Sequence, residues 1–178
     1  MTTESKQKQD TAPPAPQPQI GLALGSGLAR GFAHIGALRA LNRHGIKPTI
    51  VAGTSIGSLV GGCYLAGKLD EFEEWALALN RRKVFTYLDF RVRSAGLIGG
   101  TRLIKMLEEH FSDMIVEDLP HPFISIAADL VTGHEVWLRK GNLIDAMRAS
   151  FALPGVKECA VEIVFDPAQI SFRDNQEF

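Results

Sequence analysis

Short apolar runs alternate with helical patterns along most of this chain. Between residues 32 and 41 apolar side chains recur at every third position, and Gly45 then marks the end of the expected helix. The run from Ser58 to Ala66 is small or apolar almost throughout, which is typical of a buried helix. This alternation predicts an α/β fold with a mostly parallel sheet. The expected strands lie at 20–24, 49–52, 123–127 and 135–138.

Two further segments have the pattern of amphipathic helices. The first runs from Leu69 to Arg82, and Asp70 is expected to cap its N-terminus because aspartate is a favoured capping residue. The second runs from Thr101 to Phe111 and gathers its apolar residues on one face. Both helices are therefore expected to pack one side against a common core.

A G-x-S-x-G pentapeptide, Gly53 to Gly57, lies between an expected strand and an expected helix. A serine in such a sharp turn presents its hydroxyl at the positive end of the helix, and a Cβ on either flanking glycine would clash. The pattern indicates the nucleophile elbow of a serine hydrolase, with Ser55 as nucleophile. The simpler alternative is a glycine-lined turn in which Ser55 only caps the next helix.

A glycine-rich loop, Gly25 to Gly31, joins the first expected strand to the first helix. Backbone N–H groups in such a loop can hold negative charge, which in acyl transfer is the oxyanion of the tetrahedral intermediate. Arg30 either braces this loop or is a solvated arginine at the start of the helix. A dinucleotide site is disfavoured because the glycines follow G-x-G-x-x-x-G, and no acid ends the second strand.

Together with the segments 127–133 and 148–155, these motifs resemble the patatin-like phospholipase family, in particular its compact bacterial members. The resemblance covers about residues 20–156. It implies a three-layer α/β/α fold, a Ser–Asp dyad, hydrolysis of fatty acyl esters of lipids, and no metal or cofactor. Carried over by position, Ser55 is the nucleophile, between the elbow glycines Gly53 and Gly57. The oxyanion loop would comprise Gly25, Gly27, Leu28, Ala29 and Arg30.

The aspartate of the dyad is the part that this sequence supplies least clearly. The family places it in an Asp-Gly turn after a Pro-Gly pair, and no Asp of this chain is followed by Gly. Asp166 follows a strand-like run but precedes Pro167, which fixes φ and removes an N–H. Asp166 is thus the candidate base, whereas Asp174 lies in a polar tail. The fold is expected to be incomplete at its C-terminus.

A missing base predicts weak or absent hydrolysis, since losing one member of a catalytic unit costs on the order of 10⁴ in rate. The alternative of another class is a catalytically inactive lipid- or acyl-binding module of the same fold. A conventional Ser–acid–His triad is also open in chain order, through His110, His121 or His134. His134 reads as a turn residue and His121 as a loop residue, while His34 and His44 read as packing or surface residues.

Composition fits one domain with a substantial core, assigned to residues 19–156, since 46% of the 178 residues are hydrophobic. Residues 1–18 read as a disordered polar tail, and residues 157–178 as a divergent segment. The chain has no run that reads as a signal peptide or a membrane span. Cys63 and Cys159 have no disulfide or metal spacing, so a cytoplasmic location with free thiols is expected.

The net charge of −1 at pH 7 argues against a nucleic-acid partner. Basic and aromatic residues nevertheless gather in the segment 81–105, where only Asp89 is acidic. This segment has two interpretations: a peripheral contact with anionic lipid headgroups, or the simpler one of an ordinary solvated face. The expected partner is a lipid or acyl-ester substrate.

Overall fold

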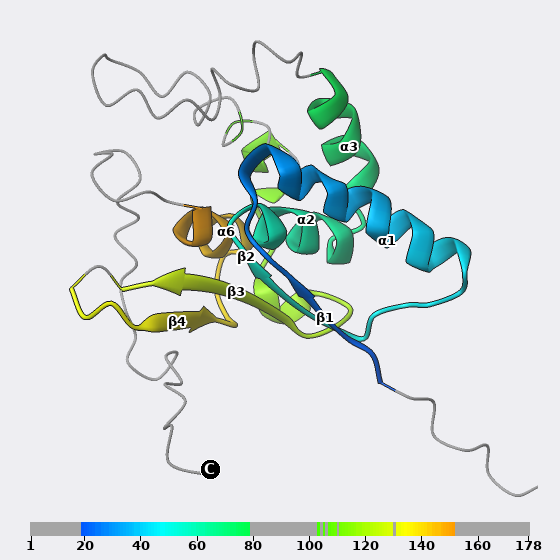
Figure 1. Cartoon of the computed structure of the whole chain (residues 1–178). Coiled ribbons are helices and arrows are strands. Elements are labelled where there is room, and N and C mark those ends of the chain that lie inside the picture. Colours follow the sequence, from blue (N-terminus) through cyan, green and yellow to red (C-terminus); the bar gives the residue numbers. More distant parts are fainter. Residues whose placement is uncertain are drawn as a thin grey trace, which may run out of the picture.

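The computed structural model describes residues 19–78, 103, 105, 107–109, 111–129 and 131–151. A four-stranded sheet with the order β1-β2-β3-β4 forms its centre (Figure 1). The first three strands are parallel, and β4 runs antiparallel to β3, so the predicted α/β class with a mostly parallel sheet is confirmed. The strands are β1 (Gly21–Leu24), β2 (Ile50–Thr54), β3 (Phe123–Ala128) and β4 (Glu135–Leu138).

The helices α1, α2, α3 and α6 lie on one side of this sheet, with α2 packed against the strands (Figure 1). The connections β1–α1–β2 and β2–α2–β3 step in the same direction across the sheet, and right-handed crossovers then place both helices on one face. The second helical layer of a three-layer fold stays a prediction. The helices are α1 (Ala33–Arg43), α2 (Ile56–Leu65), α3 (Leu69–Ala78) and α6 (Leu143–Phe151), with short 3₁₀ helices η1 (Leu28–Phe32) and η2 (Val116–Asp118).

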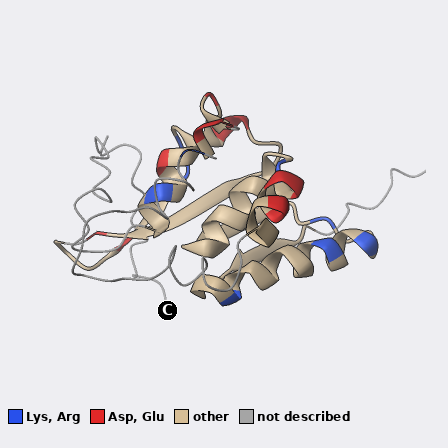
Figure 2. Ribbon diagram, turned by 90° about the horizontal axis from the view of Figure 1, so that it is seen from above, with Lys and Arg blue, Asp and Glu red and all other residues tan. Residues whose placement is uncertain are grey.

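The helix α2 is the centre of the hydrophobic core. It is buried at every residue except Tyr64, and it contains no charged side chain (Figure 2). Burial raises the pKa of the Cys63 thiol, which is fully enclosed and therefore chemically inert. Val51 from β2, Phe72 from α3 and Met147 from α6 pack in the same core. Of the expected helix over 101–111, the described residues Leu107 and Phe111 are also buried there.

Glycine ends α1 and α2 in the same way. Gly45 and Gly67 have φ values of 71° and 70°, which glycine adopts without a steric penalty. After α1, the N–H of Ile46 donates to the carbonyl oxygen of Leu41 at 2.9 Å, the bond typical of a glycine-terminated helix. The predicted end of the first helix at Gly45 is confirmed.

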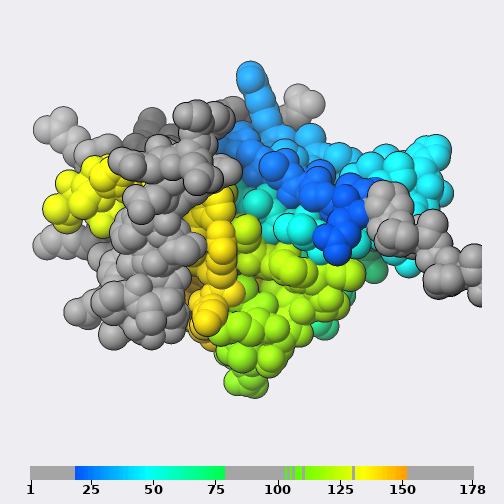
Figure 3. All heavy atoms as spheres, turned by 90° about the horizontal axis from the view of Figure 1, so that it is seen from below, coloured from blue at the N-terminus to red at the C-terminus, as the bar shows by residue number. Residues whose placement is uncertain are grey.

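The segment before β3 is held against the start of α6. Ile115 pairs with Asn142 in an isolated antiparallel bridge, and the N–H of Leu143 donates to the carbonyl oxygen of Met114 at 3.0 Å. Figure 3 shows this side of the molecule, where the lime-green segment that includes η2 lies beside the gold and orange segment of α6. These contacts fix α6 from its first turn.

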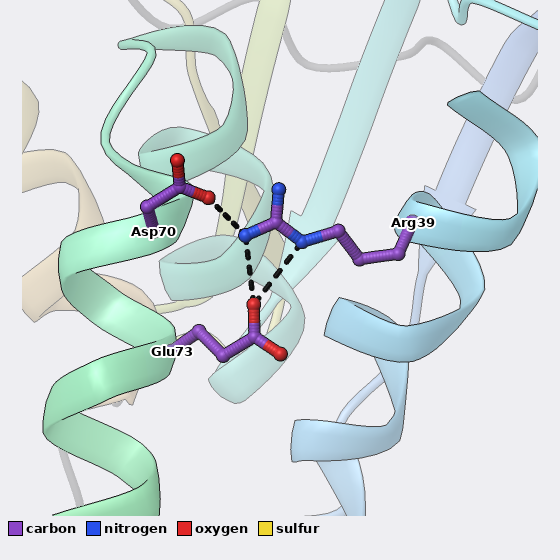
Figure 4. A network of polar contacts seen from close by, with 3 residues as sticks. All are labelled: Arg39, Asp70 and Glu73. Atoms are coloured by element: carbon purple, nitrogen blue, oxygen red, sulfur yellow. Dashed lines mark hydrogen bonds and ion pairs between the residues drawn. The ribbon is translucent and has the colours of Figure 1, made fainter. Parts of the chain in front are cut away.

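Asp70 was predicted to cap α3, and this prediction is wrong. The N–H of Phe72 donates to the carbonyl oxygen of Lys68 at 3.2 Å, so the helix begins at Leu69, the predicted first residue, and Asp70 lies inside its first turn. Its carboxylate instead contacts the guanidinium of Arg39 on α1, which also donates from Nη2 to Glu73 at 2.7 Å (Figure 4). An ion pair with another helix has replaced the local capping bond.

None of the described helices is long and apolar enough to cross a membrane. Several predictions concern residues outside the described ones: the tail 1–18, nearly all of the segment 81–105, and the C-terminal segment 157–178 with Asp166, Asp174 and Cys159.

Candidate active site

Ser55 is the single residue between β2 and α2, and its backbone is strained. Its φ is 55° and its ψ is −121°, a combination that non-glycine residues rarely adopt. Among the described residues, only Leu28 shares a positive φ with a side chain. Such conformations cost roughly 1–3 kcal/mol each and persist where the surrounding structure holds them. The predicted strand–turn–helix is present, and Ser55 stands at its apex.

The glycines beside Ser55 let backbone segments approach closely. A Cβ on Gly53 would lie 2.5 Å from the carbonyl oxygen of Gly57 and 2.5 Å from the nitrogen of Ser58. A Cβ on Gly57 would lie 2.6 Å from the carbonyl oxygen of Gly25. Real Cβ atoms essentially never approach within 3.0 Å, so both positions require glycine. The steric reason that the sequence suggested for these glycines is confirmed.

The glycine-rich loop lies directly against the first turn of α2. A Cβ on Gly31 would overlap the side chain of Ile56, the residue after Ser55. On the same turn, Gly57 faces the backbone of Leu24 and Gly25, where β1 ends and the loop begins. Two segments about 30 residues apart in sequence therefore meet at the Ser55 turn, as an oxyanion loop beside a nucleophile requires.

Unpaired N–H groups gather at the start of η1. The N–H groups of Gly27, Leu28 and Ala29 have no acceptor among the described residues. The N–H of Arg30 differs, because it donates to the carbonyl oxygen of Gly27 at 3.0 Å. Leu28 has a φ of 49° and an exposed side chain, so its N–H is fixed by a strained backbone. The N–H groups of residues 27–29 are thus available to an anion, whereas that of Arg30 is not.

His34 supports the loop from α1. Its Nε2 lies 2.9 Å from the carbonyl oxygen of Gly25, so the ring N–H donates to the backbone of the loop. The interpretation of His34 as a packing or surface residue missed this contact. A histidine one helical turn after a glycine-rich loop was the available signal, but its spacing alone does not distinguish a brace from a surface residue.

Ser150 contacts the turn from the far end of α6. Its Oγ accepts a hydrogen bond from the N–H of Ser55 at 2.7 Å and donates to the carbonyl oxygen of Ile126 at 2.6 Å. A partner 95 residues away in sequence leaves no trace in local spacing, and so it was missed as a site contact. No hydrogen bond to the hydroxyl of Ser55 itself is present among the described residues.

Asp129 and His134 lie in the turn between β3 and β4, and His121 lies in the loop before β3. The Oδ1 of Asp129 accepts from the N–H groups of Thr132 and Val131 at 3.0 and 2.7 Å, and these bonds lower the pKa of its carboxyl group. His134 is exposed at the end of this turn, as predicted, and His121 is exposed in a loop. Within the described chain, no acid or histidine hydrogen-bonds to Ser55, and no cluster of His, Cys, Asp and Glu could hold a metal.

The patatin-like phospholipase family matches residues 22–169 of this chain, which includes every contact described above. The chain belongs to the patatin-like phospholipase family. The match begins in β1 and continues past residue 156, where the resemblance in motifs ends, so it also includes Asp166.

Relatives of this patatin-like chain occur in bacteria and animals. It is 42% identical over 139 residues to an uncharacterized NTE family protein of Mycobacterium tuberculosis, covering 78% of this chain and 39% of the relative. It is 37% identical over 143 residues to a patatin-like phospholipase domain-containing protein of Caenorhabditis elegans, covering 76% and 10%. Identity to the neuropathy target esterase sws of Drosophila persimilis is 31% over 141 residues, covering 76% and 10%. The chain thus spans well under half the length of these relatives.

Proposed function

We propose that this patatin-like chain is a serine acyl hydrolase domain that acts on carboxylic esters of lipids. The observation that carries the proposal is a strained serine beside a loop with unpaired N–H groups. Ser55 stands at the apex of the turn, and the N–H groups of residues 27–29 lie in the loop packed against the same helix turn. Family membership supports lipid esters as the substrate class.

In this proposal the Ser55 hydroxyl attacks the ester carbonyl carbon. A base takes the hydroxyl proton, and the carbonyl oxygen becomes an oxyanion that accepts bonds from the Gly27, Leu28 and Ala29 N–H groups. Removing one such donor typically costs about 3–4 kcal/mol of transition-state stabilisation. The C–O bond to the alcohol then breaks, and the alcohol leaves with a proton. Water attacks the acyl-serine in the second half of the cycle and releases the fatty acid.

Asp166 is the candidate for the base, as the partner of Ser55 in a Ser–Asp dyad. It is supported by its place after a strand-like run and by its inclusion in the family match. Against a fully active dyad stands Pro167, where the family's turn has glycine. We therefore expect slow hydrolysis compared with a complete dyad.

A second candidate function is a catalytically inactive module that binds lipids or acyl groups. It is favoured by one specific observation: among the described residues, no acid forms a hydrogen bond with Ser55. In such a module the glycine-rich loop would bind the carbonyl or headgroup oxygens of a lipid without bond cleavage.

Labelling with a fluorophosphonate probe separates the two functions, because the probe reacts only with an activated serine hydroxyl. The hydrolase predicts labelling of the wild type and none of Ser55→Ala. If Asp166 is the base, Asp166→Ala also loses labelling, while the matched control Asp174→Ala keeps it. Absence of labelling in a folded wild type would reject the hydrolase and favour the binding module.

Peripheral membrane contact through residues 81–105 completes the proposal for a cytoplasmic lipid hydrolase. Seven basic residues there against one acid suit anionic headgroups. Co-sedimentation with phosphatidylserine-containing vesicles should decrease as salt rises. Binding that is independent of both salt and anionic lipid would reject this contact.

A further inference from the structure

The hydroxyl of Ser150 occupies an unusual place in the sheet. In the parallel pair β2–β3, Thr54 lies opposite Ile126, and the N–H of Val51 donates to the carbonyl oxygen of Pro122 at 3.0 Å. In a parallel ladder such bonds repeat at every second residue on each strand. Continued for four residues, this register assigns the N–H of Ser55 to the carbonyl oxygen of Ile126.

That last direct bond is replaced by a bridge. The Oγ of Ser150 lies between the two groups, accepts from the Ser55 N–H at 2.7 Å, and donates to the Ile126 carbonyl oxygen at 2.6 Å. Both short bonds use the hydroxyl as donor and acceptor at once, so its orientation is fixed. The inserted atom separates β2 from β3 where Ser55 leaves the sheet.

We propose that Ser150 is a positioning residue for Ser55, and that its inserted hydroxyl holds the turn in its strained conformation. The proposal rests on the proposed role of Ser55 as nucleophile. A backbone with φ of 55° needs restraint from its surroundings. Ser150 restrains the N–H of the strained residue itself, and it does so from a helix that packs on both β3 and α2.

Ser125 provides a matched control within the same pair of elements. Its Oγ donates to the carbonyl oxygen of Ala146 at 2.7 Å, and so it also joins β3 to α6 through a hydroxyl. It lies 2.7 Å from the Oγ of Ser58 and is fully buried, but it has no bond to Ser55. Ser125→Ala therefore removes a comparable link between sheet and helix, together with a contact to Ser58, and leaves the bond from the Ser55 N–H to Ser150 in place.

The first measurement is amide hydrogen exchange of Ser55, followed by NMR on the full chain, which needs no enzymatic activity. Ser150→Ala should raise the exchange rate of the Ser55 amide by roughly tenfold or more, because its acceptor is lost. Ser150→Thr, which keeps a hydroxyl, should restore protection. Unchanged protection in Ser150→Ala, or an equal loss in Ser125→Ala, would overturn the proposal.

The second measurement is the fluorophosphonate reaction, resolved into the maximal rate and the probe concentration at half-maximal rate. Ser150→Ala should lower the maximal rate on the order of 100-fold, since a misplacement of about 1 Å costs that much, and leave the half-maximal concentration unchanged. Ser125→Ala should keep the wild-type rate. A wild type that does not react rejects the proposed function alone, and the exchange measurement then still decides whether Ser150 holds the turn. A reactive wild type with an equally reactive Ser150→Ala overturns the positioning role.

Discussion

Two neighbouring strands end at the same edge of the sheet in very different turns. After β2, the turn at Ser55 is enclosed by groups from distant parts of the chain: Gly25, in the loop after β1, lies close to Gly57, and Ser150 in α6 accepts from the Ser55 N–H. After β3, the turn from Asp129 to His134 is held by itself. The Asp129 N–H donates to the His134 carbonyl oxygen at 2.8 Å, and the Asp129 carboxylate accepts from two N–H groups of the turn.

The two turns differ in whether their polar groups are satisfied locally or by distant parts of the chain. A turn closed by its own side chain has its polar groups satisfied and needs no neighbour. A turn held from outside can keep a strained residue and leave its hydroxyl unbound, at the cost of dependence on remote packing. Changes at remote contacts should therefore disturb the Ser55 turn far more than changes within the hairpin disturb the hairpin.

The largest effect is expected for Gly57→Ala. The new Cβ would meet backbone carbonyl groups of Leu24 and Gly25, which cannot rotate away, so destabilisation of about 3 kcal/mol or more is expected. The control is Gly36→Ala in α1, where a Cβ meets nothing within 4 Å and should stabilise the helix by roughly 0.5–1 kcal/mol. Urea unfolding measures both. Equal effects at the two positions would contradict the close approach at Gly57.

A smaller effect of opposite sign is expected for Leu28→Gly. Leu28 has a φ of 49°, and the residue is 47% exposed, so glycine removes backbone strain and gives up only a half-buried side chain. Stability should rise by about 1 kcal/mol. Leu24→Gly, which removes a buried side chain of β1, is the contrasting variant and should be clearly destabilised. A loss of stability in Leu28→Gly would mean that its backbone is not strained.

The ion pairs of Arg39 test whether contacts between residues distant in sequence contribute to stability when they are not buried. They join α1 to α3, but the Arg39 and Glu73 side chains are 35% and 36% exposed, and that of Asp70 is 75% exposed. Surface pairs typically contribute about 0.2–1 kcal/mol to the free energy of unfolding. Arg39→Ala should therefore lower that free energy by about 0.5 kcal/mol at low salt and by less at high salt, which screens exposed charges. Thermal unfolding at low and high salt measures this. A cost as large as that of Gly57→Ala would show that sequence separation, rather than burial, sets sensitivity.

The smallest effect is a pH dependence in the hairpin. Backbone N–H groups hold the Asp129 pKa below its ordinary value of 3.8, so its ionised form stabilises the folded state. This contribution is present above pH 3.8 and is lost as the pH falls through the lower pKa of the folded state. Asp129→Asn should therefore differ from wild type near pH 7 and approach it in acid. Unfolding curves near pH 7 and in acid measure the difference in the free energy of unfolding between the variant and the wild type. A difference that stays the same at both pH values would contradict the role of the charge.

The sequence predicted the parts of this fold that depend on local pattern. Strands, the parallel sheet, the end of α1 at Gly45 and the turn at Ser55 follow from apolar runs and glycine positions. Asp70 was misplaced because its carboxylate bonds to Arg39 on another helix, and that competition is invisible in local spacing. The contacts of His34 and Ser150 escaped prediction for the same physical reason, since each joins elements that only the folded chain brings together.

The glycines of β2 and α2 differ in which substitutions the surrounding structure could accommodate. At Gly53 and Gly57 an added methyl group meets backbone, so no change elsewhere makes room for it. At Gly62 it would lie 2.6 Å from the sulfur of Met147, a flexible side chain on the same helix as Ser150. Positions 62 and 147 can therefore exchange volume with each other, while the two glycines beside Ser55 are fixed for as long as the turn exists.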